Sequence, residues 1–235
     1  MTIDRSLLPT VDPFTLMDRE SARIEDFLRT LVEAGDDDPG WQAPTRCSEW
    51  DARALFGHLR HLEDYNAACV GGTVKALIGA IESAHDFDDF NAFGIAKYAT
   101  TPVAELFEDW RSMNAAYRSA MRERGDGVVD TSVGEYPSLF QAYYLATEYA
   151  THGDDFGLAT TYDGRDAWRA AFVRFACTEQ EKPLTFEVQE GSTLVTLDGA
   201  TYEVIDRDLG EAGVVRLRAD HPLPQAVRNA LRCAA

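Results

Sequence analysis

Residues 138–159 read SLFQAYYLATEYATHGDDFGLA, and their apolar side chains recur at intervals of three and four residues. This spacing is typical of a helix with one buried face. The apolar positions are Leu139, Phe140, Tyr143, Tyr144, Leu145, Tyr149 and Phe156. We therefore expect a long helix from Ser138 to Ala159 that packs against other helices.

Three earlier segments have a similar pattern and a comparable length. They are Phe14–Ala34, Trp50–Val70 and Pro102–Arg124. Ser48 is a candidate cap for the second, and Pro102 suits the first position of the third. Thr73–Ser83 predicts a shorter helix, and the polar stretch 125–134 predicts a connector. Four helices of roughly 20 residues joined by modest loops predict a bundle.

After Gly164 the apolar residues fall at every second position, which indicates strands. Strands are expected at 184–188, 194–197 and 202–205, with 214–217 as a fourth candidate. Helices are expected on either side of them, at Ala167–Thr178 and Gln225–Arg232. The sequence thus predicts an α+β chain, with a four-helix bundle over residues 1–164 and a small α+β domain over 165–235.

The chain is strongly acidic, because 40 Asp and Glu against 22 Lys and Arg leave a net charge of −18. Such a charge repels nucleic-acid phosphates and anionic membrane surfaces, so we expect neither as a partner. The sequence has no run of about 18 apolar residues that would predict a membrane span, and its N-terminus lacks the pattern of a signal peptide. The four cysteines form no CxxC pair, which favours reduced thiols and a cytoplasmic location.

Candidates for metal binding or acid–base chemistry are few. The five histidines are His58, His61, His85, His152 and His221. Glu148 and His152 stand four residues apart, so both side chains project from one face of the predicted helix. Such a pair can bind one metal ion or form a solvated ion pair. His58 lies among apolar residues on a second helix and therefore faces the core, where it would meet a hydrogen-bond partner or a metal. Two imidazoles and one carboxylate make a three-ligand zinc set with an open fourth position.

Two further residues bear on this candidate site. Asp155 follows His152 by three residues and could accept the free N–H of its imidazole. His61 lies one turn beyond His58, but a surface pair with Asp64 explains it equally well. The sequence contains neither a phosphate-binding glycine motif nor a GxSxG nucleophile motif.

Motifs around these residues resemble a known family. CSEWDARALFGHL at 47–59 resembles the C-P-G-W-…-A-H-L signature of mycothiol-dependent maleylpyruvate isomerase-like proteins, with Ser48-Glu49 in place of Pro-Gly. These proteins belong to the DinB-like superfamily of metal-binding four-helix bundles. YLATEYATHGDD at 144–155 is similar to the family's E-x-x-x-H-x-x-D helix, and the close of the chain from residue 218 is similar to that of many members. The resemblance implies zinc, or another divalent transition metal, on His58, Glu148 and His152.

The resemblance also implies a chemistry. The metal would deprotonate the thiol of mycothiol, and the thiolate would attack an electrophilic small molecule. The isomerase type carries an arginine where this chain has Tyr144 and Leu145, so we expect thiol transfer rather than cis–trans isomerisation of maleylpyruvate. Tyr144 and Arg228 are candidate substrate-binding residues. Zinc-hydroxide hydrolysis and a non-catalytic metal- or small-molecule-binding module are the alternatives, and the chain is expected to act as a monomer or a homodimer.

Overall fold

The structure, a computed structural model, describes residues 10–81, 86–159 and 162–233. Close contacts divide the chain into two compact units, of which the first is Pro13–Ala159 and the second contains the described residues after it. Helices build the first unit, and helices with a small sheet build the second, so the predicted α+β class is confirmed. Within the described ranges, no helix is both long and apolar enough to cross a membrane.

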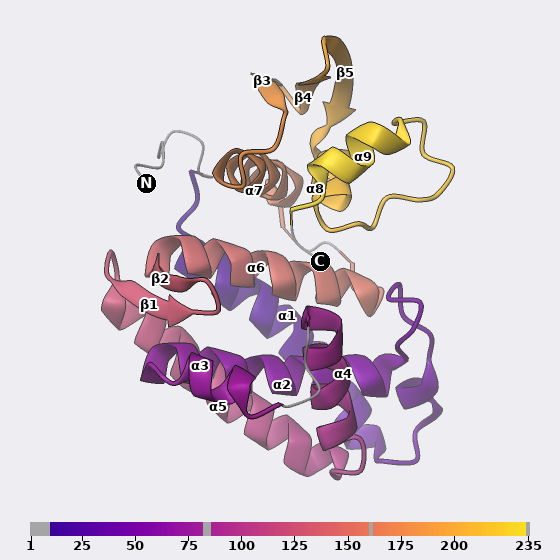
Figure 1. The fold of residues 1–235 in the computed structure, drawn as a ribbon. Coiled ribbons are helices and arrows are strands. Elements are labelled where there is room, and N and C mark those ends of the chain that lie inside the picture. The colour runs from indigo at the N-terminus through magenta and orange to yellow at the C-terminus, as the bar shows by residue number, and fades with distance from the viewer. Residues whose placement is uncertain (1–9, 82–85, 160–161, 234–235) are drawn as a thin grey trace. The chain divides into compact units, whose positions relative to one another are not determined.

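Four long helices and two short ones make up most of the first unit (Figure 1). Their bounds are α1 Pro13–Ala34, α2 Ala52–Gly71, α3 Val74–Gly79, α4 Phe87–Tyr98, α5 Val103–Arg124 and α6 Ser138–Asp155. α1 packs along α5 and α6, while α2 packs against α5 and is flanked by α4. The backbones of α2 and α6 make few close contacts. Side chains therefore fill the space between these two helices.

The start and the end of α2 have local causes. The Asp51 carboxylate accepts the backbone N–H of Ala54 at 2.8 Å and caps the helix. The prediction that Ser48 caps this helix is therefore wrong, because Ser48 lies in the preceding loop. Gly72 ends the helix with a φ of +69°, a left-handed conformation that glycine adopts without strain.

Apolar side chains from the long helices form the core of the bundle. α1 and α2 contribute residues that are fully buried at helical spacing, and burying each large side chain stabilises the fold by roughly 1.5–3 kcal/mol. These residues are Leu16, Met17, Ile24, Leu28, Leu55, Phe56 and Leu59. The apolar residues that gave these segments their helical period therefore supply much of the core of the bundle.

A 3₁₀ turn and a hairpin lie between the long helices. Pro39–Gln42 forms the 3₁₀ turn, η2. β1 (Val128–Thr131) and β2 (Gly134–Pro137) form the antiparallel hairpin, so the stretch 125–134, predicted as a connector, contains a strand and the turn of this hairpin. The Thr131 hydroxyl stabilises the turn, since it donates to the Gly134 carbonyl at 2.8 Å.

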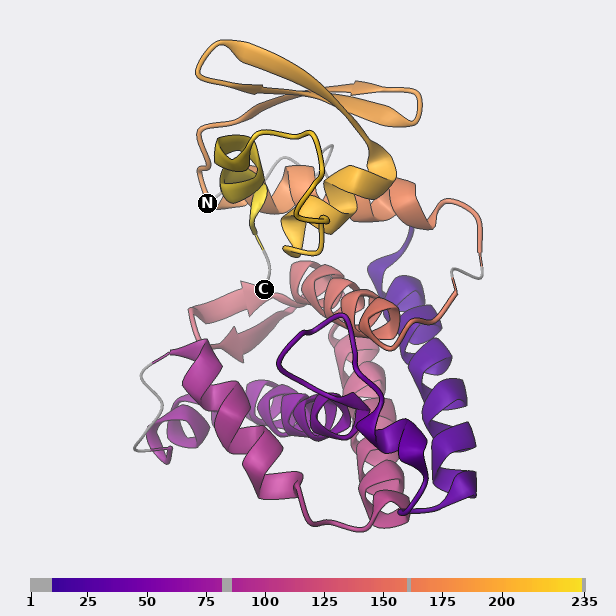
Figure 2. The same ribbon diagram turned by 90° about the vertical axis from the view of Figure 1, so that its right-hand side faces the viewer.

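The second unit contains three helices and a three-stranded antiparallel sheet in the order β3–β4–β5, which lies on one side of its helices (Figure 2). The bounds are α7 Arg165–Glu179, β3 Thr185–Gln189, β4 Ser192–Leu197, β5 Ala200–Ile205, α8 Asp206–Gly213 and α9 Gln225–Leu231. The prediction of a fourth strand at 214–217 is wrong. Val215 has a φ of +58°, which turns the chain after α8 and prevents an extended conformation there.

Candidate metal centre

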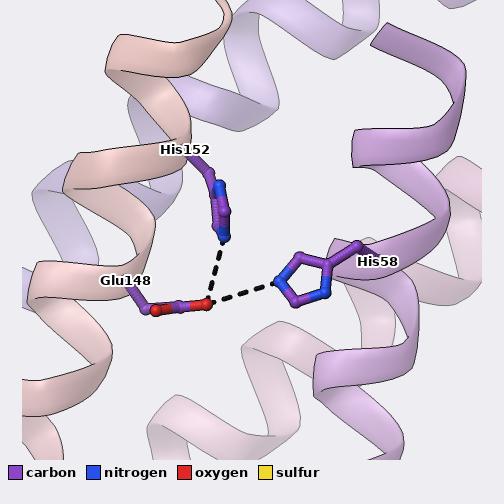
Figure 3. Close-up of side chains that lie close together, drawn as sticks. All are labelled: His58, Glu148 and His152. Atoms are coloured by element: carbon purple, nitrogen blue, oxygen red, sulfur yellow. Dashed lines mark hydrogen bonds and ion pairs between the residues drawn. The ribbon is translucent and has the colours of Figure 1, made fainter. Parts of the chain in front are cut away.

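Three side chains from α2 and α6 converge in the space between these helices (Figure 3). His58 projects from α2, while Glu148 and His152 project from successive turns of α6. Both histidines are buried, and the Glu148 side chain is 26% exposed. The cluster is therefore enclosed by protein on the imidazole side and reachable by solvent at the carboxylate.

The two imidazoles point toward the same carboxylate oxygen. Nε2 of His58 lies 3.3 Å from Oε1 of Glu148, and Nε2 of His152 lies 3.1 Å from that atom. All three atoms lie within 4.8 Å of one another. This set of two imidazole nitrogens and one carboxylate oxygen could hold a metal ion.

Asp155 fixes the orientation of His152. Its side chain is fully buried, and Oδ2 lies 3.1 Å from Nδ1 of His152. An ionised carboxylate can only accept, so Nδ1 carries the proton and donates. This bond directs Nε2 toward Glu148, as a carboxylate commonly does for an imidazole that binds metal.

The members of the cluster control one another's charge. Burial would lower the pKa of His152, but the Glu148 and Asp155 carboxylates outweigh it and raise this pKa to about 9. Burial would raise the pKa of Glu148, but the two imidazoles outweigh it and hold this pKa well below its usual range. Burial lowers the pKa of His58 despite its bond to Glu148. At neutral pH the metal-free cluster thus contains an ionised carboxylate, a protonated His152 and a neutral His58.

Comparison with known proteins gives one match. A family model described as the mycothiol maleylpyruvate isomerase N-terminal domain matches residues 21–157. This range covers more than half of the chain and contains His58, Glu148, His152 and Asp155. The chain belongs to this family. The predicted family is therefore confirmed, although no curated protein and no solved structure matches the chain.

A loop before α2 forms one wall of the candidate centre in this member of the mycothiol maleylpyruvate isomerase N-terminal domain family. The Trp50 ring lies 4.9 Å from the His58 ring and 6.4 Å from the His152 ring, measured between centroids. Thr45 braces the loop by donating its hydroxyl to the Trp50 carbonyl at 2.7 Å. No local pattern in the sequence indicates this role of Trp50, because the contact depends on how the loop folds back.

The remaining sequence candidates of this family member lie in different places. Tyr144 is half-buried on α6, one turn before Glu148, and its ring lies 6.2 Å from that of Tyr136. Arg228 belongs to the second unit, where it donates to the carbonyls of Arg218 and Ala219 at 3.4 and 3.3 Å. Substrate binding by Tyr144 or Arg228 stays a prediction.

The other three histidines are not part of the cluster or cannot be placed. His61 is buried beside Asp64 on α2, on the side that α4 covers. His221 lies in the second unit, with Nε2 3.0 Å from Asp208 and Nδ1 accepting the Leu223 N–H, so both of its nitrogens have partners. His85 lies outside the described residues. The helix expected over Thr73–Ser83 is α3, which ends earlier, at Gly79.

Proposed function

We propose that this chain is a metal-dependent enzyme that uses mycothiol as a co-substrate and transfers it to an electrophilic small molecule. The observation that carries the proposal is the convergence of His58, His152 and Glu148 on one point between α2 and α6. Family membership supports mycothiol as the thiol. The bond formed would join the thiol sulfur to an electrophilic carbon, and a leaving group would depart from that carbon.

The distances from Glu148 to the two imidazoles support a divalent metal. Ligand atoms around a tetrahedral zinc ion, with bonds of 2.0–2.2 Å, lie roughly 3.3–3.6 Å apart. The two distances to Oε1 of Glu148, 3.1 and 3.3 Å, are close to this value. Zinc suits the ligand set best, although nickel, iron or cobalt would accept it. When bound, such an ion supplies a positive charge that deprotonates a coordinated thiol near neutral pH.

The residues of the chain would prepare the site for an anionic sulfur. Two neutral imidazoles and one carboxylate carry a single negative charge, so a divalent ion among them would retain a net positive charge. Asp155 would keep Nε2 of His152 aimed at the ion, and the Trp50 ring would shield the His58 side from water. The exposed edge of Glu148 marks the side from which a thiol could enter.

Cis–trans isomerisation is the second candidate, because the family is named for an isomerase. Both reactions would begin with attack of the thiol sulfur on an electrophilic carbon, which loses a leaving group in transfer and adds the sulfur reversibly in isomerisation. Tyr144 and Leu145 stand where an arginine would suit a dicarboxylate such as maleylpyruvate, which favours transfer.

The test combines metal analysis with turnover in the presence and absence of mycothiol. We expect about one equivalent of a divalent metal, and formation of a mycothiol adduct with a haloalkyl electrophile, detected by mass spectrometry. Isomerisation of maleylpyruvate without a lasting adduct would favour the second candidate. Turnover of an ester or amide without thiol would identify a hydrolase instead, and protein without metal would identify a non-catalytic module.

A further inference from the structure

A second group of buried polar side chains connects α2 and α6, and the proposed chemistry does not use it. The carboxylate of Glu63 on α2 accepts the hydroxyl of Tyr149 on α6 at 2.8 Å. It also accepts the amide N–H groups of Asn114 on α5, at 2.9 Å, and of Asn66, at 3.1 Å. Asn114 extends the connection to α1, since its Oδ1 accepts the Ser21 hydroxyl at 2.5 Å. We call these five residues the inner polar network.

The centre of this network is a carboxylate that is costly to bury. Glu63 is fully buried, and its hydrogen-bond partners are the neutral groups of Asn66, Asn114 and Tyr149. Burial raises the pKa of Glu63 despite these three bonds. Replacing Glu63 and its partners together by apolar side chains of similar volume would avoid this desolvation cost, and such replacements of whole buried polar groups are often neutral or stabilising. The stability of the core therefore does not by itself explain the network.

The network lies next to the candidate ligands on both helices. Tyr149 directly follows Glu148, and Glu63 follows His58 by five residues, a rise of roughly 7.5 Å along the helix axis. α2 and α6 make few close backbone contacts, so bonds between their side chains connect the two helices directly. The Glu63–Tyr149 bond crosses the same gap as the metal-ligand candidates.

We propose that Glu63, acting through Tyr149, is a positioning residue for the metal centre. The inference rests on the proposed function, because it presupposes a metal on His58, Glu148 and His152. Successive side chains are separated by about 100° around a helix, so a rotation of α6 that draws Tyr149 away from Glu63 also swings Glu148 relative to His58. The fixed carboxylate of Glu63 thus restrains the direction of a ligand that it does not touch.

Binding of cobalt(II) to the metal-free full chain tests this role, because its visible spectrum reports coordination geometry while the titration gives the affinity. Tyr149→Phe removes one oxygen atom and keeps the ring. We expect this variant to bind Co²⁺ about tenfold more weakly and with an altered spectrum. Glu63→Leu should show at least the same loss. Glu63→Gln, whose amide oxygen can still accept the Tyr149 hydroxyl, should retain most of the affinity.

Tyr117→Phe is the matched control. The Tyr117 hydroxyl on α5 is buried and has no hydrogen-bond partner among the described residues, so its removal should change neither affinity nor spectrum. Circular dichroism and thermal unfolding of each metal-free variant show whether it is folded. If Glu63→Leu does not fold, Tyr149→Phe decides the result.

A purely structural network would give a different result. Tyr149→Phe would then unfold at a lower temperature but bind Co²⁺ with wild-type affinity and spectrum, which would overturn the positioning role and leave the proposed function intact. A wild-type chain that binds no Co²⁺ would overturn the proposed function and, with it, this inference.

Discussion

Two clusters each contain a histidine of α2 beside a carboxylate, and these histidines, His58 and His61, lie about one turn apart. The clusters differ in what surrounds the carboxylate. In the candidate metal centre, Glu148 interacts with the imidazoles of His58 and His152. In the second cluster, Oδ2 of Asp64 lies 3.4 Å from Nδ1 of His61. Both clusters contain a buried histidine within reach of a carboxylate, so a sequence pattern would rank them alike.

Asp64, however, already has basic partners. It accepts bonds from Arg60 at 2.8 Å and from Lys97 at 2.7 Å, and from the Tyr98 hydroxyl at 2.7 Å. Burial would raise the pKa of Asp64, but His61 and these donors hold it far below its usual range. A metal ion there would meet two positive charges, which repel it. We therefore expect a metal at Glu148 rather than at Asp64, because Asp64 already pairs with Arg60 and Lys97.

Removing one imidazole from each cluster should separate them most clearly. We expect His152→Ala to lose nearly all bound metal, because the two remaining ligands hold a divalent ion weakly. His61→Ala should keep its metal, although the loss of packing against Phe90 will lower its stability. Metal analysis of the purified variants measures the difference. Metal retained by His152→Ala would mean that Glu148 and His152 form only an ion pair.

The pH dependence of metal affinity should follow the raised pKa of His152. Below about pH 9 this imidazole is protonated in the metal-free protein, so a bound metal must displace one proton. Affinity for zinc should therefore rise about tenfold for each unit between pH 6 and 8. His58 contributes less to this slope than His152, because burial lowers its pKa. Competition with a chromophoric chelator at several pH values measures the slope, and a flat profile would contradict the charge assignment.

The same shift has the opposite effect on the stability of the metal-free protein. Folding raises the pKa of His152 from its ordinary value near 6.5 to about 9. Protonation of His152 therefore stabilises the folded chain, and this contribution is fully present below about pH 6.5. This contribution is lost as the pH rises through about 9. Thermal unfolding in the presence of a chelator, compared between wild type and Glu148→Gln, should show the loss in wild type and a smaller one in the variant.

A smaller effect is expected from the residue that orients His152. Asp155→Asn replaces the carboxylate acceptor by a neutral amide oxygen, which holds the imidazole N–H less strongly. Metal affinity should fall about tenfold, the lower end of what such partners contribute. The chelator competition described above measures it. An unchanged affinity would show that the His152 ring is held by packing alone.

The smallest change in metal affinity is expected at the second cluster. Asp64→Asn should leave zinc affinity unchanged, yet lower the free energy of unfolding by about 1–3 kcal/mol, since Arg60 and Lys97 lose the negative charge that they pair with. Urea unfolding and the chelator competition give the two quantities. A fall in metal affinity equal to that of Asp155→Asn would remove the distinction between the clusters.

The sequence predicted the long helices well, because their apolar period continues over several turns. It was less successful where elements are short. The strands of the hairpin β1–β2 have four residues each, too few to show an alternation. The strand expected at 214–217 failed because an apolar run does not reveal the positive φ of Val215. α6 ends at Asp155 rather than at Ala159, since Gly157, with a φ of +79°, turns the chain.

For the candidate site, the spacing of Glu148 and His152, the apolar neighbours of His58 and the family motifs around them together suggested that these residues meet. The structure brings these side chains together, while metal binding itself stays a prediction. Neither the place of Trp50 nor the bond between Glu63 and Tyr149 could be foreseen. Both depend on the path of a loop or the rotation of a helix about its axis, which a single sequence does not encode in any local pattern.

Asp155 contributes to the site through two different parts of its structure. Its carboxylate holds His152, and its backbone carbonyl accepts the N–H of Arg46 at 3.0 Å, which anchors the loop that carries Trp50. Every amino acid has that carbonyl, whereas the carboxylate belongs to the side chain. A substitution of Asp155 can therefore change the orientation and the pKa of the His152 imidazole, while the backbone bond to Arg46 remains. Relatives of this chain could therefore carry different residues at position 155 and still keep the loop that places Trp50 beside the site.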